Sequence, residues 1–591
     1  MYYLRTINNS NATDFKTLKL LFVLLLFLNT GACFSQTQLF IPDTLNGTLF
    51  NLTVQTGTKQ FFGTNNTPTY GFNGNFLGPT LIFNQNDSIN INVTNNLTQA
   101  TTVHWHGLHV APHNDGGPHQ LINPAATWSP GFKVRNEAAT FWYHPHGQGK
   151  TELHVSKGLA GMIIVRDNIE STYTLPRRYK IDDFPIIVQS KAFDVLYQIA
   201  TATHEDSIMM VNGTIKPFLP TPQQMVRLRL LNGSSDRTYN FGLSNNSNFN
   251  LIASDGGLLS QPYVTNRLRL SPGERAEIVV DFSSYTIGTQ LYLKSYSSEF
   301  PKGIIGADSV GTSTIVISEG YYSNLLNGAD FNVLRFDIIA QTANPVTTIP
   351  SSFTPKVPLL ESNADNTRRF VFSPDTILSG QQGKVDGPFY INNMFFHMDT
   401  MNVTTYLNKT EIWKLVNKTL VAHPFHIHDI QFFVLDINGN PPPPQYQGLK
   451  DVILVQPKDS VRFITKFTDF FDPMVPYMYH CHLLHHEDDG MMGSFLVLDP
   501  AVIGVKENKL NNSIVSVFPN PTKDVLHINI KAFDPYAPID LKIYGVLGKL
   551  IYSAKLTSAN NIVNASPWQK GIYTVSLTNK EGSVQQKIVV E

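Results

Sequence analysis

Ten of the 18 histidines in this chain of 591 residues fall in four short clusters, which suggests a shared chemical role. Side chains two residues apart in a strand project from the same face, so a His-x-His pair can present both imidazoles to one metal centre. The spacing therefore predicts metal-binding strands. The clusters are His104-Trp105-His106, His144-Pro145-His146, His423-Pro424-Phe425-His426-Ile427-His428, and His480-Cys481-His482 followed by His486 and Met491.

The fourth cluster combines two kinds of ligand on one strand. In His480-Cys481-His482 the two histidines point one way and the thiolate points the other, so one strand can serve two metal sites back to back. A thiolate, two imidazoles and a weak thioether form the blue-copper electron-transfer site, and Cys481, His423, His486 and Met491 supply such a set. The other eight histidines suit copper and are too many for one mononuclear zinc.

All four motifs, in this order, resemble those of the multicopper oxidases, the laccase-like family. The resemblance runs from about Leu39 to Pro500 and includes Asp115-Gly-Gly-Pro118. It implies a copper enzyme with four ions per chain that couples one-electron oxidation of a reducing substrate to the four-electron reduction of O2 to water. Phenols or aromatic amines are the first expectation for the substrate, because Gln341 to Asn393 contains no Met. Cuprous or other metal ions are the alternative.

The resemblance also implies a role for each candidate residue. Cys481 passes electrons out of the type 1 site, and Glu487 and Asp115 deliver protons to oxygen, although each acid could instead be an ordinary turn or hydrogen-bonding group. The implied ligands are Cys481, His423, His486 and Met491 for type 1 copper; His104 and His426 for type 2; and His106, His144, His146, His428, His480 and His482 for the type 3 pair. The residues expected at the surface, in turns or in packing are His109, His113, His119, His154, His204, His397, His485, His527, Met394, Met398 and Met401.

Short runs of alternating apolar and polar residues predict the strands that must position these ligands. Such runs occur at 88–93, 225–231 and 276–281, and each predicts a strand with one buried face. Amphipathic helical stretches are scarce, so an all-β fold is expected. The family resemblance implies three consecutive cupredoxin-like Greek-key β-sandwich domains, at 36–170, 171–325 and 326–502. The trinuclear copper cluster would lie between the first and third domains, and the middle domain would hold no copper.

The two ends of the chain predict export. Lys16 and Lys19 precede nine apolar residues, Leu20 to Leu28, which suit a signal peptide over 1–35 and fall short of the roughly 20 needed to span a bilayer. Lipid attachment at Cys33 is the alternative. Residues 511–591 resemble the C-terminal sorting domain of the type IX secretion system, a small β-sandwich; a generic small binding sandwich is the alternative. The protein should be secreted, or held at the cell surface, by way of the periplasm.

The composition restricts the partners. The chain has 44 Lys and Arg and 45 Asp and Glu, which gives a net charge of −1. Proteins that bind nucleic acids have a basic surface, so a nucleic-acid partner is not expected. No stretch after the leader has the length of a transmembrane segment, and a monomer is expected. The expected partners are O2, a small reducing substrate and the secretion machinery. A cupredoxin scaffold without oxidase activity is the alternative class, but such a protein should have lost ligands, and none is missing here.

Overall fold

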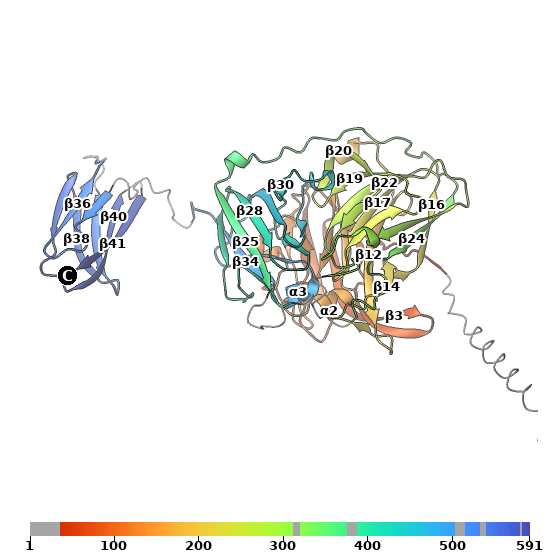
Figure 1. Ribbon diagram of the computed structural model, residues 1–591, viewed down its shortest axis with the longest axis horizontal. Helices are drawn as coiled ribbons and strands as arrows, with labels where there is room; N and C mark the ends of the chain where they lie inside the picture. The colour runs from red at the N-terminus through yellow and green to blue at the C-terminus, as the bar shows by residue number, and fades with distance from the viewer. Residues whose placement is uncertain are drawn as a thin grey trace, which may run out of the picture.

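The computed structural model describes residues 36–310, 320–374, 387–502, 515–531, 533, 539–579 and 582–591. The expected leader and Cys33 lie outside these ranges. Strands dominate, and the all-β prediction is confirmed (Figure 1). None of the described helices is long and apolar enough to cross a membrane. They are α2 (Thr151–Ser156), α3 (Leu484–Asp488) and the single-turn 3-10 helices η1 (Pro112–Asn114), η2 (Glu170–Thr172), η3 (Ser297–Glu299), η4 (Glu361–Asn363) and η5 (Pro444–Tyr446).

The first sandwich packs two sheets around one apolar core. In β6 the alternation predicted from the sequence is present: Ile89, Ile91 and Val93 are buried while Ser88 and Asn90 are exposed. One sheet has the order β2 (Thr44–Asn46), β5 (Thr80–Asn84), β11 (Gly161–Arg166), β10 (Ala139–His144), β7 (His104–His106). The other has β4 (Asn65–Phe72), β3 (Leu49–Phe62), β6 (Ser88–Asn95), β8 (Thr127–Trp128), with β9 (Gly131–Lys133) also on β6.

The second sandwich is larger and uses strands from distant parts of the chain. Its first sheet runs β1 (Thr37–Gln38), β16 (Pro217–Pro222), β24 (Asp330–Ile339), β23 (Gln290–Tyr296), β18 (Tyr239–Leu243), β21 (Leu268–Leu270). Its second runs β15 (Thr214–Ile215), β14 (Ile208–Val211), β12 (Asp183–Phe193), β17 (Met225–Asn232), β22 (Arg275–Asp281), β19 (Phe249–Ser254), β20 (Gly257–Thr265), with β13 (Ile199–Ala200) on β12.

The third sandwich carries the remaining histidine clusters. Its sheets are β26 (Phe389–Ile391), β25 (Asn366–Pro374), β28 (Thr410–Asn417), β32 (Ser460–Lys466), β30 (Phe433–Ile437), and β27 (Val403–Tyr406), β34 (Met492–Leu498), β33 (Tyr477–Cys481), β29 (His423–Ile427), β31 (Val452–Val455). A fourth, small sandwich follows. Its sheets are β35 (Val515–Phe518), β36 (Val525–Ile530), β39 (Asn560–Asn564), and β38 (Leu550–Leu556), β37 (Ile539–Gly545), β40 (Gly571–Asn579), β41 (Gly582–Val590).

The chain does not pass cleanly from one sandwich to the next. Leu39 packs in the core of the second sandwich, far from the strands that follow it in sequence. Ile305, Val310 and Tyr321 pack in the core of the third, and the chain then returns to the second as β24, between β16 and β23. The expected boundary between residues 325 and 326 therefore separates β24 from the sandwich that it completes. β24 hydrogen-bonds to β16 and β23 of the second sandwich, although the segment before it packs in the third.

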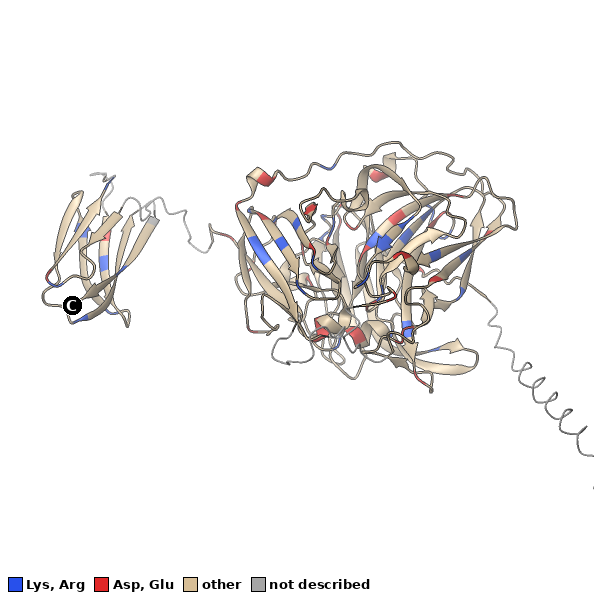
Figure 2. Ribbon diagram, viewed as in Figure 1, with Lys and Arg blue, Asp and Glu red and all other residues tan. Residues whose placement is uncertain are grey.

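Two strands differ from their predicted pattern. β17 and β22 were expected to bury one face only, but Arg227, Arg229 and Glu277 are each 1% exposed. Arg229 forms a two-pronged ion pair with Asp183 of β12 and donates to Glu277, and Arg227 donates to Glu277 and to Glu170. We call this group (Arg227, Arg229, Glu277, Asp183 and Glu170) the arginine interface, since Thr140 of the first sandwich also donates to Glu277. Figure 2 shows blue and red segments side by side on these strands.

Candidate metal centres

Four strands from two sandwiches bring eight histidines together. In the first sandwich β10 pairs with β7 so that His144 lies opposite His104, and in the third β29 pairs with β33 so that His426 lies opposite His480. All eight side chains are buried. We call them the histidine interface: His104, His106, His144 and His146 from the first sandwich, and His426, His428, His480 and His482 from the third.

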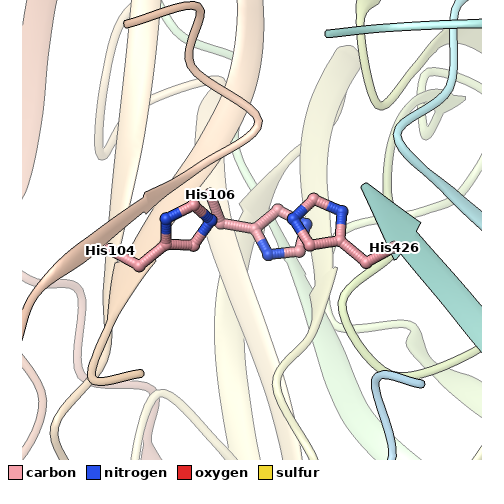
Figure 3. A group of neighbouring side chains, drawn as sticks. All are labelled: His104, His106 and His426. Atoms are coloured by element: carbon pink, nitrogen blue, oxygen red, sulfur yellow. The ribbon is translucent and has the colours of Figure 1, made fainter. Parts of the chain in front are cut away.

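The ring nitrogens of this interface gather in three groups in which the candidate ligand atoms lie within 4.8 Å of one another. In Figure 3 His104 and His106 extend from one strand towards His426 on the strand opposite, and the rings of His106 and His426 overlap. The groups are His104, His106 and His426; His106, His144 and His482; and His146, His428 and His480. The structure thus assembles every histidine predicted for the type 2 and type 3 sets.

Two aspartates orient four of these rings. Asp115 accepts from His104 Nδ1 through its backbone carbonyl (2.9 Å) and from His428 Nδ1 through its carboxylate (2.7 Å). Asp451 orients the remaining two of these four rings, His426 and His106, in the same way. Its carbonyl lies 2.8 Å from His426 Nδ1 and its carboxylate 3.2 Å from His106 Nε2. Each aspartate therefore joins one ring from each sandwich.

These contacts determine which ring nitrogens carry protons, because carbonyl and carboxylate oxygens only accept. His106 Nε2 and His144 Nδ1 are donors, so the facing pair, His106 Nδ1 and His144 Nε2 at 3.4 Å, consists of two acceptors. Facing acceptors at such distances repel each other unless a cation lies between them.

The protonation of the interface also fits metal binding. Burial lowers the pKa of His146 and of His482 to about 3, and it lowers the pKa of His106, His426 and His428 well below the usual value. These imidazoles are therefore neutral, which is the form that binds metals. Among the described residues, the Nε2 atoms of His104, His426, His428 and His482 have no hydrogen-bond partner although they are buried. Neutral imidazoles with free inward nitrogens fit copper.

Glu487 lies beside the third of these groups, at the contact between α2 and α3, which Figure 1 shows next to each other. Its Oε2 is 3.1 Å from His480 Nδ1, its Oε1 is 3.3 Å from His146 Nδ1, and Thr151 Oγ1 donates to Oε1. Asp488 accepts from two backbone amides of the first turn of α2. The carboxylate of Glu487 is thus fixed between one histidine of each sandwich.

The other face of β33 forms a separate site with a thiol. Cys481 Sγ lies 3.5 Å from the Nδ1 atoms of both His423 and His486. Burial raises the pKa of the Cys481 thiol well above its usual value, so the thiol ionises only when it gains a cationic partner. Met491 is fully buried in the same core, where its backbone bonds with Cys481 and His486 hold it at the site.

Asp451 is a site residue that the sequence analysis missed. It is a lone acid before an apolar strand, and nothing in its neighbours marks it. Two histidines expected in packing are indeed structural: His485 pairs with Asp236, and His109 bridges Asp429 and Asp469. The loop with Met394, Met398 and Met401 packs against β34 through Asn402 and Ser494.

The chain belongs to the multicopper oxidase family. Three family models described as "Multicopper oxidase" match residues 53–170, 189–320 and 354–501, and a "Secretion system C-terminal sorting domain" matches 516–591. The protein is therefore an oxidoreductase of the multicopper oxidase family, built from cupredoxin domains. Its C-terminal sorting domain supports export.

Three relatives illustrate the range of the family. "Multicopper oxidase mco" of Staphylococcus haemolyticus is 34% identical over 461 residues, which are 76% of this chain and 88% of that protein. "Cell division protein FtsP" of Dickeya dadantii is 30% identical, over 75% of this chain and 88% of its own length. A laccase-like multicopper oxidase from Ochrobactrum sp., with oxidase activity towards lignin model compounds and lignosulfonate, is 30% identical, with a TM-score of 0.67 over 78% of this chain and 100% of its own.

Proposed function

We propose that this protein is an exported laccase-like oxidase that takes single electrons from phenols or aromatic amines and uses four of them to reduce O2 to water. The observation that carries the proposal is the complete ligand set on the two sides of β33: a thiol site on one side, and eight buried histidines gathered on the other. The proposed ligands are His423, Cys481, His486 and Met491 for type 1 copper, His104 and His426 for type 2, and His106, His144, His146, His428, His480 and His482 for type 3.

Four bound copper ions would supply the one-electron transfer and the oxygen chemistry, which side chains cannot perform alone. The chain supplies the connection: Cys481 belongs to the thiol site, while its neighbours His480 and His482 belong to the two type 3 groups. A few covalent bonds of one strand therefore join electron donor and acceptor sites. All twelve ligands come from one chain, which supports a monomer as the working unit.

Glu487 and Asp115 are the proposed proton carriers. Glu487 lies 3.1 Å from His480 and also accepts from the hydroxyl of Thr151. Burial alone would raise the pKa of Glu487, but the neighbouring His146 and His480 lower it, so its carboxylate is placed to relay protons between the histidine interface and that hydroxyl. Asp115 Oδ2 accepts from His428, while its Oδ1 accepts no hydrogen bond from the described residues and lies 3.3 Å from His104 Nδ1. Oδ1 is the atom at which Asp115 would carry a proton.

Two observations support organic substrates. The segment from Gln341 to Asn393 lacks Met, so it offers no soft sulfur ligands for metal ions. The rings of His423 and His486 both pack on Phe389, with centroids 4.8 and 4.6 Å away, so the surroundings of the type 1 ligands are aromatic. The laccase-like relative that oxidises lignin model compounds points the same way.

Oxidation of cuprous ions is the second candidate, and exposed thioethers favour it. Met394 and Met401 are 40% and 39% exposed on a loop that packs against Ser494. Ser494 follows the proposed ligand Met491 closely in the sequence. Thioethers are soft ligands that select Cu(I).

The test is to load the protein with copper, measure metal content and colour, and follow O2 uptake. About four ions per chain, a blue colour and rapid O2 uptake with a phenol are expected, given the ligand count. Faster uptake with Cu(I) than with any phenol or aromatic amine would favour metal oxidation. A colourless protein that consumes no O2 would support the non-catalytic scaffold instead.

We also propose that residues 516–591 direct the enzyme through the periplasm and the type IX machinery to the medium or the cell surface.

A further inference from the structure

The histidine interface is supported by Arg275, a residue of the second sandwich, which provides none of the proposed ligands. Arg275 acts through Asp451. Asp451 is fully buried and holds His426 through its carbonyl and His106 through its carboxylate. Its two carboxylate oxygens also accept from Arg275, the first residue of β22: Nη1 to Oδ1 at 2.5 Å and Nη2 to Oδ2 at 2.6 Å. The orientation of Asp451 is thus fixed from the second sandwich.

Arg275 is itself held by all three sandwiches. Its Nε donates to the carbonyl of Thr140 in the first sandwich, Nη1 also donates to the carbonyl of Gly273, and Nη2 also donates to the carbonyl of Asp255. With the two bonds to Asp451, all five N–H groups of the guanidinium have acceptors. Side chains of Arg275 and Asp451 are fully buried, so neither the guanidinium nor the carboxylate can turn to solvent.

The backbone next to His106 confirms how close this packing is. Gly107 has φ +85°, and a Cβ at this position would lie 2.5 Å from Asp451 Oδ2 and 2.7 Å from Arg275 Nη2. Any other residue would push the ion pair away from His106. Asp115 orients the other stacked pair of rings, His104 and His428, and receives no hydrogen bond from an arginine in the described part of the chain, so the two aspartates are supported differently.

We propose that Arg275 is a positioning residue for the histidine interface: it fixes Asp451, and Asp451 in turn sets the tautomer and ring orientation of His106 and His426. The inference rests on the proposed function, since these two rings are proposed copper ligands. It also gives the middle sandwich a role at the copper centres. Partners that orient metal-binding histidines typically change metal affinity by about 10- to 100-fold when removed.

The experiment compares Arg275→Lys with Arg229→Lys. Lysine keeps the positive charge but cannot form the two-pronged pair or satisfy five acceptors. Arg229 is a matched control, because it is equally buried in the same sheet, pairs with Asp183 and Glu277, and forms no hydrogen bond with a histidine among the described residues. Copper content, competition with a chelator, and the separate electron paramagnetic resonance signals of type 1 and type 2 copper are measured, together with thermal unfolding of the metal-free proteins.

We expect Arg275→Lys to keep the blue colour and the type 1 signal, and to lose type 2 and type 3 copper to the chelator about 10- to 100-fold more readily. Arg229→Lys should lower thermal stability by a similar amount and keep wild-type copper affinity. Equal copper retention in both variants would overturn the inference. If Arg275→Lys does not fold, Asp451→Asn decides: wild-type affinity for type 2 and type 3 copper would also overturn it. A wild-type protein that binds no copper would refute the proposed function, and not this positioning role alone.

Discussion

The histidine interface and the arginine interface are both buried between sandwiches and both polar, but they differ in what they leave unpaired. In the arginine interface Arg227 and Arg229 each meet carboxylates within hydrogen-bond distance. In the histidine interface acceptors face one another, as His106 Nδ1 and His144 Nε2 do at 3.4 Å. A polar interface whose charges are all matched holds domains together, whereas one with facing acceptors requires a further cation.

The largest expected effect separates chemistry from folding. Cys481→Ser should reduce phenol oxidation to background and abolish the blue colour, because a hydroxyl is a hard, poorly ionised replacement for the thiolate. Copper at the histidine interface should still load, and unfolding of the metal-free protein should change little, since Ser has nearly the size of Cys. Absorption spectra and O2 uptake measure the first effect. A variant that stays blue would contradict the type 1 assignment.

Glu277→Gln should have the opposite effect: it should lower stability and leave copper binding unchanged. It removes the shared partner of Arg227 and Arg229, and breaking a buried ion pair from one side typically costs about 3–5 kcal/mol. The free energy of unfolding of the metal-free protein should fall by that amount, as measured by denaturant titration. Copper content and colour should match the wild type. Loss of copper would show that the two interfaces cannot be perturbed independently.

A smaller, pH-dependent effect is expected at His109, which joins the first and third sandwiches outside both interfaces. Burial alone would lower the pKa of His109, but the charge and hydrogen bond of Asp429 outweigh burial and raise the pKa to about 9. The stabilisation is thus complete below the ordinary pKa of histidine, about 6.5, and is lost as the pH rises through 9. The free energy of unfolding should fall by about 3 kcal/mol between pH 6 and pH 10. In His109→Gln this part of the pH dependence should disappear.

The smallest effect is expected from removing the fourth sandwich. Its core consists of its own residues, Val515 to Val590, and none of the proposed ligands lies in it. A chain ending at Val502, made without its leader and loaded with copper, should oxidise phenols at nearly the full-length rate. In the native host it should accumulate in the periplasm. Loss of copper from the shortened protein would show that the fourth sandwich supports the other three, and normal export would contradict its sorting role.

The difference between the interfaces also explains what the sequence could predict. His480-Cys481-His482 is informative because strand geometry alone sends its side chains to two sites. Arg227 and Arg229 alternate along their strand as residues that face water do, and their shared partner, Glu277, lies in another strand. Asp451 has no local signature, because the groups that make it important, Arg275 and His106, come from two other sandwiches. Local periodicity thus predicted the strands and the shared face of each His-x-His pair, the family resemblance implied the ligand set, and the long-range ion pairs required the structure.

The return of the chain to the second sandwich as β24 limits how this protein can be recombined. Val310 and Tyr321 already belong to the third core, and β24 then completes a sheet with β16 and β23. A ribosome that has reached Val310 has therefore not yet produced a finished second sandwich. Neither sandwich can be transplanted as one continuous stretch of sequence, and the second also includes β1, which precedes the first sandwich, so the smallest exchangeable unit runs from β1 to β34.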